Sequence, residues 1–504
     1  MTNLTDILNY SEDTPLLFTQ IYFWIFFTLL LLVYSILYRK KALRNAYLFF
    51  MSLYFYFKSG GYFFSLLIIS TVVDYCIGLL LYRSKSRPLR KLYVTISLLV
   101  NLGMLAYFKY TYFLTDMFNR VFQTQYEAIN IFSRWSNDLL GTGFDISRII
   151  LPVGISFFTF QTISYTMDVY RGKVKPVRNI IDFGFYVSFF PQLVAGPIVR
   201  AADFVPQLYR DYILTVREMG HALFLILSGL IKKMMISDYI SINFVDRIFS
   251  DPVAYSGFEN LLGVYGYSLQ IYCDFSGYTD IAIGIGLLLG FRLPVNFNSP
   301  YKAGNISNFW KRWHISLSSW LRDYLYIPLG GSRKGAIRTH INLLITMLLG
   351  GLWHGANLRF VIWGGLHGIG LVFHKLWLKL FPAKKRPSRI QKFIAVFITF
   401  HFVTLLWIFF RAENMVDVRN IFNQILFHFD LNLVPQMVWS YRTVFAIIVT
   451  GFVIHWLPSS LKEQYRGLFI RTPIYLKIVI ILIIVFIIYQ VKSAEIQPFI
   501  YFQF

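Results

Sequence analysis

The chain has 504 residues, of which 56% are hydrophobic, 19% aromatic and 14% charged. A soluble core of this length carries more charge and shorter apolar runs, so the composition excludes an ordinary soluble protein. The net charge of +23 does not indicate a nucleic-acid partner, because Lys and Arg form short clusters between apolar runs and no stripe along a polar face. The sequence predicts an all-α polytopic membrane protein, with a single integral-membrane domain over residues 1–504 that contacts lipid.

The first part of the chain predicts a set of N-terminal helices over residues 16–170. An acidic segment at residues 1–15 precedes the first apolar run, and a basic cluster at residues 39–44 follows it. Because basic loops stay in the cytoplasm, the N-terminus is expected outside. Residues 115–145 mix both signs of charge and are expected to form an external loop. The predicted spans cover residues 16–37, 46–57, 62–81, 92–114 and 149–170.

Residues 180–370 form the predicted core motif region. Its first stretch, FGFYVSFFPQLVAGPIVR, is interrupted by Pro191, Gly196 and Pro197. These breaks favour a re-entrant segment over a straight span. Residues 291–340 carry many cationic side chains and are expected largely at the cytoplasmic face. Further spans are predicted over residues 220–240, 258–290, 341–352 and 360–376.

The last part of the chain predicts C-terminal helices over residues 392–490. Its spans are expected at 393–410, 444–457 and 474–489, which places the C-terminus outside as well. The total is about eleven crossings with one or two re-entrant pieces. No internal repeat is visible, which weakens the case for an inverted-repeat transporter.

His354 is the first candidate for chemistry, because it lies in a Trp-His-Gly-Ala turn between two apolar runs. An ionisable side chain at membrane depth is a functional hypothesis by default, and imidazole is well matched to proton transfer near neutral pH. The structural alternative is a histidine satisfied by a carbonyl group or a helix end.

His314 is the second candidate. It lies in NFWKRWHISLSSWLRDYLYIPLGG, where four aromatic residues and Leu317 recur at three- and four-residue steps and predict one amphipathic helix. The alternative is an interfacial anchor, which explains Trp313 and the neighbouring basic residues. His367 lies on the following apolar run, where a structural role is the commoner outcome for a single histidine.

Four charged residues of the same region need partners. Arg322 and Asp323 are adjacent and point in different directions on a helix, so separate partners are expected for them. Asp274 and Asp280 lie in a Gly-rich apolar run. A proton relay is one interpretation, but buried hydrogen bonding to neighbouring helices is favoured.

The sequence lacks the common motifs of zinc sites and of serine nucleophiles. The sequence has no HExxH motif and no Cys/His cluster, so no metal site is expected. The only two cysteines, Cys76 and Cys273, lie in apolar stretches and offer no paired thiolates. A GxSxG nucleophile turn is also missing.

Five linked strings carry a family resemblance: FFPQLVAGPIVR, YCDFSGYTDIAIG, FRLPVNFNSPY, FWKRWHISLSSWLRDYLYIPLGG and MLLGGLWHGAN. In content, order and spacing they resemble the membrane-bound O-acyltransferase (MBOAT) family, in particular its bacterial branch with the membrane subunit of alginate O-acetylation. The resemblance implies a ring of helices, thin at its centre, with a tunnel through it. It also implies that His354 is catalytic and that His314 is a second functional residue of the tunnel. The further candidates for lining the tunnel are Trp313, Trp353, Asn357, Arg322, Asp323, Asp274, Asp280 and His367.

The resemblance also implies the substrates and the setting. The enzyme is expected to hold no bound cofactor and to take an acyl group, most simply acetyl, from acetyl-CoA or an acyl-carrier-protein thioester in the cytoplasm. It would pass that group across a bacterial inner membrane, through an extracytoplasmic hydrolase-like acetyltransferase partner, to a polysaccharide such as alginate, another exopolysaccharide or a cell-wall glycan. Transfer of D-alanyl or another acyl group is one alternative, and a polytopic transporter or flippase is the alternative from another class.

Overall fold

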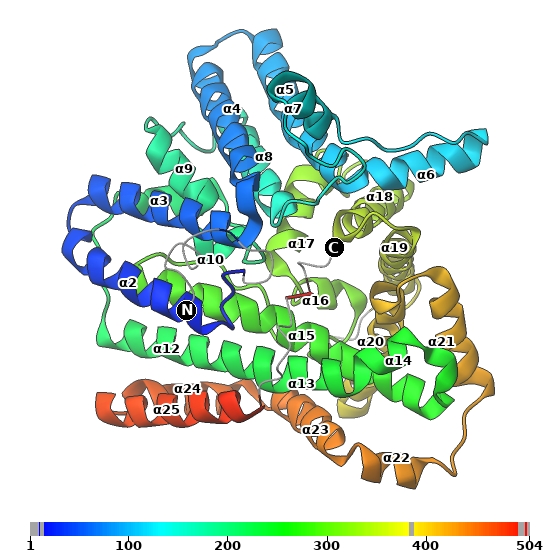
Figure 1. Ribbon diagram of the computed structural model, residues 1–504. Coiled ribbons are helices and arrows are strands. Elements are labelled where there is room, and N and C mark those ends of the chain that lie inside the picture. The colour runs from blue at the N-terminus through cyan, green and yellow to red at the C-terminus, as the bar shows by residue number, and fades with distance from the viewer. Residues whose placement is uncertain (1–9, 11–14, 383–387, 492–498, 501–504) are drawn as a thin grey trace.

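The computed structural model describes residues 10, 15–382, 388–491 and 499–500. Throughout these residues the regular structure is helical, as the composition predicts (Figure 1). The predicted acidic segment at residues 1–15 lies almost entirely outside the described residues, as does most of the basic run after Pro382. The N-terminal helices are α2 (Ile21–Leu37), α3 (Lys41–Gly60), α4 (Phe64–Arg83), α5 (Arg87–Leu105), α6 (Thr111–Phe122), α7 (Ile131–Leu140) and α8 (Ile155–Tyr170).

The central region is built from long helices and short broken ones. In Figure 1 the longest helix, α15, runs through the middle of the molecule with α12 along one side of it. The helices of this region are α9 (Ile180–Ser188), α10 (Phe190–Leu193), α11 (Ala201–Leu208), α12 (Val216–Leu230), α13 (Asp238–Ile240), α14 (Asp246–Ser250), α15 (Gly257–Leu288), α16 (Ile306–Trp310), α17 (Ile315–Leu321), α18 (Ala336–His354) and α19 (Leu358–Leu380).

The C-terminal helices cover the side of the molecule next to α12, α15 and α19. They are α20 (Arg389–Arg411), α21 (Met415–Phe427), α22 (Val434–Ser440), α23 (Arg442–Trp456), α24 (Ser459–Arg471) and α25 (Ile474–Val491). Helix α24 is a short polar-faced helix between two apolar ones, and α25 is apolar almost throughout.

The structure has fewer helices of span length than the number of spans that the sequence predicts. Among the described residues, seven helices are long and apolar enough to cross a membrane, or eight if the bent pair α22 and α23 counts as one span. This count is lower than the predicted eleven, because it includes only helices of at least 18 residues and counts Lys41–Arg83, which holds two of the predicted spans, once. Helix α8, with 16 residues, is below that length. The expected external loop at 115–145 is corrected, since much of it forms α6 and α7.

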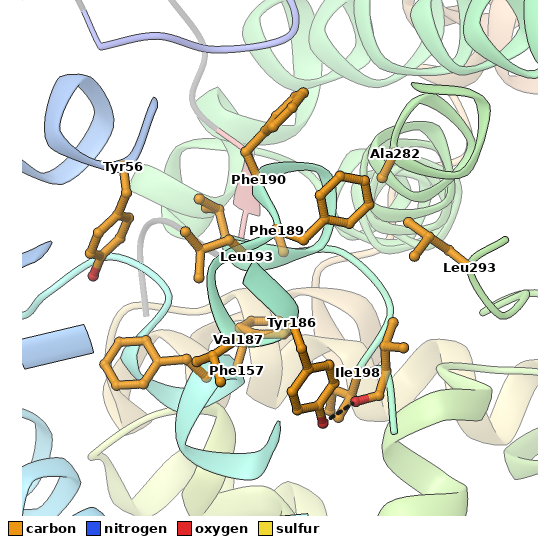
Figure 2. Packing of buried hydrophobic residues seen from close by; sticks show 14 of the residues in the cluster. Tyr56, Phe157, Tyr186, Val187, Phe189, Phe190, Leu193, Ile198, Ala282 and Leu293 are labelled. Atoms are coloured by element: carbon orange, nitrogen blue, oxygen red, sulfur yellow. Dashed lines mark hydrogen bonds between the residues drawn. The ribbon is translucent and has the colours of Figure 1, made fainter. Parts of the chain in front are cut away.

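The segment predicted to be re-entrant is broken, as its prolines indicate. Helix α9 ends at Ser188, α10 holds only four residues, and the chain then continues without regular structure to Arg200. Phe189 and Phe190 are fully buried at the break, where Figure 2 shows them among residues of several helices. The Tyr186 hydroxyl donates to the Val199 carbonyl at 3.0 Å and so ties the two sides of the break together. Protein therefore surrounds the irregular backbone, which is the condition for such a segment at membrane depth.

Close backbone contacts fix the two helix pairs that matter for the site. A Cβ atom on Gly229 of α12 would lie 2.5 Å from the Gly277 carbonyl oxygen of α15. A Cβ atom on Gly351 of α18 would lie 2.2 Å from the Phe360 carbonyl oxygen of α19, and one on Gly364 would lie 2.2 Å from the Met347 carbonyl oxygen. Only glycine allows the helices to approach this closely.

Candidate active site

His354 is the last residue of α18 and lies in the interior of the protein. Its exposed fraction is 3%. Its ring packs against Trp363 of α19 and Phe410 of α20, with centroid distances of 5.1 and 5.2 Å. The turn predicted after it is present, because α19 begins at Leu358. Three helices thus enclose an imidazole at a helix end.

His314 precedes α17 in a left-handed backbone conformation, with φ 44° and ψ 55°. This conformation is strained for a residue other than glycine, and such residues gather at functional sites. It breaks the single amphipathic helix that the sequence predicts into α16 and α17, so that prediction is wrong. The Nδ1 atom lies 3.2 Å from Oδ1 of Asn296, which also accepts from the Ser316 hydroxyl at 2.8 Å. Asn296 therefore holds the ring and the start of α17 together.

The two histidines lie side by side. Their ring centroids are 6.5 Å apart, and His314 is fully buried. One small reacting group could therefore be served by both rings.

Lys109 binds the peptide groups that lead to His354, a contact that sequence reasoning missed. Its Nζ donates to the carbonyl oxygens of Trp353 and His354 at 2.7 and 3.2 Å. A cation at the carboxyl end of a helix satisfies the last carbonyl groups and opposes the helix dipole. The available signal was a single lysine inside the apolar run at residues 92–114. Asn296 carried no such signal beyond its place in the string FRLPVNFNSPY.

Aromatic rings line both sides of the histidine pair. Trp353 packs against His314 at 6.0 Å and against Phe160 at 5.4 Å. Trp313 is buried and packs against Trp407, with ring centroids 4.9 Å apart, so it is part of the core and the interfacial-anchor alternative fails for it.

His367 is connected to His354 through one tryptophan. Its ring centroid lies 4.7 Å from that of Trp363 and 5.1 Å from that of Trp310. His367 is fully buried, and both of its ring nitrogens lack a hydrogen-bond partner among the described residues. The indole Nε1 atoms of Trp363 and Trp310 likewise have none in that part of the chain. A row of unsatisfied polar atoms therefore leads to His354.

Arg322 and Asp323 bind one another. The Arg322 Nε donates to Asp323 at 2.7 Å, and Arg200 contacts the same carboxylate at 2.6 Å. The prediction of separate partners is wrong, since both residues lie on a π-helical turn, Arg322–Tyr326, whose side-chain directions differ from those of an α-helix. Burial raises the pKa of Asp323, but the hydrogen bonds from Arg322 and Arg200 outweigh it, and the pKa lies below its ordinary value. These ion pairs lie on a different element from His354 and have a structural role.

Asp274 and Asp280 are paired with neighbouring lysines, as the favoured interpretation predicts. Asp274 binds Lys233 at 2.6 Å and accepts from the backbone N–H of Ile500 at 3.0 Å. Asp280 binds Lys232 at 2.6 Å. Such pairing is what buried charges require. Asn357 caps α19 by accepting from the Arg359 N–H at 3.1 Å, which is also a structural bond. The tunnel that these residues were expected to line stays a prediction.

Nothing in the described part of the chain brings three His, Cys, Asp or Glu side chains together as a metal site. Two buried histidines, neighbouring N–H donors and an apolar enclosure are instead suited to acid–base chemistry. Residues 104–412 match the model of the MBOAT, membrane-bound O-acyltransferase family. The chain belongs to this family. It is an O-acyltransferase, and its apolar helices make it a multi-pass membrane protein.

Relatives place the chain in the alginate O-acetylase-like branch of the MBOAT family. It is 36% identical to a peptidoglycan O-acetyltransferase of Helicobacter pylori over 442 residues, which cover 82% of this chain and 80% of that protein. It is 35% identical to a probable alginate O-acetylase, AlgI, of Pseudomonas putida, with coverage of 86% and 89%. Identity to a teichoic acid D-alanyltransferase of Bacillus subtilis is 32%, over 51% of this chain and 67% of that protein.

Proposed function

We propose that this MBOAT protein transfers an acetyl group from a cytoplasmic thioester, acetyl-CoA or an acyl-carrier-protein thioester, to a hydroxyl group on the way to an extracytoplasmic polysaccharide. The observation that carries the proposal is the buried pair His354 and His314, with ring centroids 6.5 Å apart. Acetyl is favoured over D-alanyl, because the two relatives that cover more than 80% of the chain are named for acetyl transfer.

The chemistry assigns one role to each histidine. The acceptor oxygen forms a bond to the thioester carbonyl carbon while its proton passes to His354. The carbon–sulfur bond then breaks, and the departing sulfur takes up the proton that His354 received, which returns the imidazole to its neutral form. In the neutral ring the His314 proton lies on Nδ1, because Asn296 Oδ1 is the acceptor beside it. With a second proton on Nε2, His314 would stabilise the negative oxygen of the tetrahedral intermediate, an effect worth about 3 kcal/mol for one well-placed donor. Asn296 keeps His314 in position for this.

The ring nitrogens of Trp310, His367 and Trp363 that are unpaired among the described residues support a binding path for the acyl donor. Leaving a buried donor unpaired costs about 1–3 kcal/mol, so a row of them needs acceptor atoms from a ligand. The amide carbonyl groups of a pantetheine arm are such acceptors. Trp310 also precedes two basic residues, Lys311 and Arg312, in the segment expected at the cytoplasmic face, where they would attract an anionic donor.

The acceptor side is proposed from the charge pattern and from the relatives. Basic residues cluster near the start of α18, at Arg333, Lys334 and Arg338, and His354 ends that helix about 28 Å away. This arrangement favours an orientation in a bacterial inner membrane in which the basic end of α18 lies at the cytoplasmic face and His354 lies toward the opposite face. In this proposal a hydrolase-like extracytoplasmic partner completes delivery to the polymer.

The test measures loss of the acetyl group from labelled acetyl-CoA in the presence of the purified protein and a soluble hydroxyl acceptor. His354→Ala should reduce the rate at least about a hundredfold, as removal of a general base does. His428→Ala is the matched control, since His428 is exposed at the end of α21. A D-alanyl carrier-protein thioester in a parallel reaction decides between the two acyl groups. Equal rates for the wild-type protein and His354→Ala would refute the assignment.

A further inference from the structure

A cavity of about 600 Å³ opens between α6 and α7, outside the histidine site. In Figure 1 α6 extends away from the body of the molecule. The cavity wall combines aromatic rings, a threonine hydroxyl and charged groups, contributed by Tyr107, Thr115, Glu127, Arg134, Trp135 and Asp138. Its volume falls within the range of small-molecule binding sites.

The charge pattern favours a position for the cavity at the membrane face opposite the basic clusters. Arg83 to Lys91 form a strongly basic stretch at the start of α5. Helix α5 and the π-helical turn after it, Ala106–Tyr110, hold 19 and 5 residues, which together span roughly 36 Å. That length crosses a bilayer, so the wall of the cavity at Tyr107 stands on the side where the acceptor is expected.

One π-helical turn, Ala106–Tyr110, connects the cavity to the peptide groups at the end of α18. Tyr107 lines the cavity, and its hydroxyl accepts from the Ile131 N–H at the start of α7 at 2.9 Å. From the same turn Lys109 binds the His354 carbonyl, and the Tyr110 hydroxyl donates to the Leu352 carbonyl at 2.9 Å. Isolated π-helical turns are frequent at functional sites. A ligand in the cavity would thus be held on the element that supports the end of α18.

The lining favours a sugar ring over other occupants. Trp135 is 58% exposed and offers a flat apolar face, on which the C–H face of a sugar can stack. Carboxylate groups accept hydrogen bonds from sugar hydroxyls, and Arg134 donates them. The lining contains two carboxylates, Glu127 and Asp138, and one guanidinium, Arg134, which contacts Asp138 at 4.0 Å. The remaining negative charge disfavours an anionic sugar.

We propose that this cavity binds an uncharged sugar unit of the acceptor polymer and holds the polymer near the outer end of the histidine site. The proposal rests on the proposed acyl transfer to a polysaccharide. The cavity does not use the histidine pair, so sugar binding and acyl transfer are measured separately.

The experiment measures binding of a tetramer of N-acetylglucosamine to the full-length protein in nanodiscs by titration calorimetry. Trp135→Ala should weaken binding at least fivefold, and Trp439→Ala should not, because Trp439 is a more exposed tryptophan on α22 that does not line the cavity. Glu127→Gln keeps the shape of the side chain but removes its charge. It should also weaken tetramer binding, because the neutral amide accepts a weaker hydrogen bond from a sugar hydroxyl. His354→Ala should bind the tetramer normally, so a failure of acyl transfer alone leaves the result intact.

Three results would overturn the proposal. The first is a wild-type protein that does not bind the tetramer, and the second is an effect of Trp135→Ala smaller than fivefold. The third is tighter binding of a uronate oligomer of the same length. If the cavity instead docks a protein, Trp135→Ala would change tetramer binding by less than fivefold and would lose binding of the protein partner.

Discussion

Replacing Gly351 with alanine should separate α18 from α19 and displace His354. The new Cβ atom would stand 2.2 Å from the Phe360 carbonyl oxygen and 3.1 Å from the Gly364 Cα. Both neighbours are backbone atoms, so neither can rotate away as a side chain would. Ordinary van der Waals contact begins near 3.4 Å, so the helices must move apart by about 1 Å.

The magnitude follows from that displacement. Overpacking of a tight contact costs about 1–3 kcal/mol, partly offset by roughly 1 kcal/mol from the better helix propensity of alanine. His354 follows Gly351 by less than one helical turn. It should therefore share the shift, and a misplacement of about 1 Å lowers a rate by about a hundredfold. Activity is expected to fall much further than stability.

Gly365→Ala is the matched control. It makes the same chemical change on α19, but its Cβ atom would meet only the Leu348 Cδ2, at 3.2 Å, which is the end of a flexible side chain. The assay compares the acyl-transfer rate and the midpoint of thermal unfolding of both variants with the wild-type protein. The reasoning fails if Gly351→Ala retains activity within twofold of Gly365→Ala.

Two further variants test the supports of the site and the basic face. Asn296→Ala should reduce acyl transfer about tenfold by releasing His314. Asn298→Ala should not, because Asn298 bonds to Arg312 through its backbone, and equal rates in the two variants would contradict the role of Asn296. Burial and the positive charge of Lys302 lower the pKa of Lys462 to about 8. The rate at which acetic anhydride modifies Lys462, followed by mass spectrometry, should therefore rise through pH about 8. Lys302→Gln should move this midpoint upward, because loss of a like charge favours the protonated amine, and an unmoved midpoint would exclude the coupling.

Much of the local structure was predictable from the sequence. Pro191 and Gly196 indicated the break between α9 and the buried irregular segment, because each removes a condition for a continuous helix. The glycine after His354 indicated the end of α18. The carboxylate of Asp274 in an apolar run indicated a buried partner, which is Lys233.

The arrangement of the site was not predictable, because it depends on backbone conformations with weak sequence signals. A left-handed φ at His314 is rare for a residue other than glycine, and it places this ring beside His354. The π-helical turns at Lys109 and at Arg322 change side-chain directions in a way that helical periodicity does not describe. The count of candidate spans differs from the prediction because hydropathy marks an apolar run without its final helix length.

The most direct test of the account follows a labelled acetyl group across a membrane. The protein is reconstituted in sealed vesicles, acetyl-CoA is supplied on the face that carries the basic loops, and a hydroxyl acceptor is enclosed on the other side. The account predicts that label reaches the enclosed acceptor with the wild-type protein and with His428→Ala, and does not reach it with His354→Ala. Equal transfer by His354→Ala would contradict the central role of that imidazole.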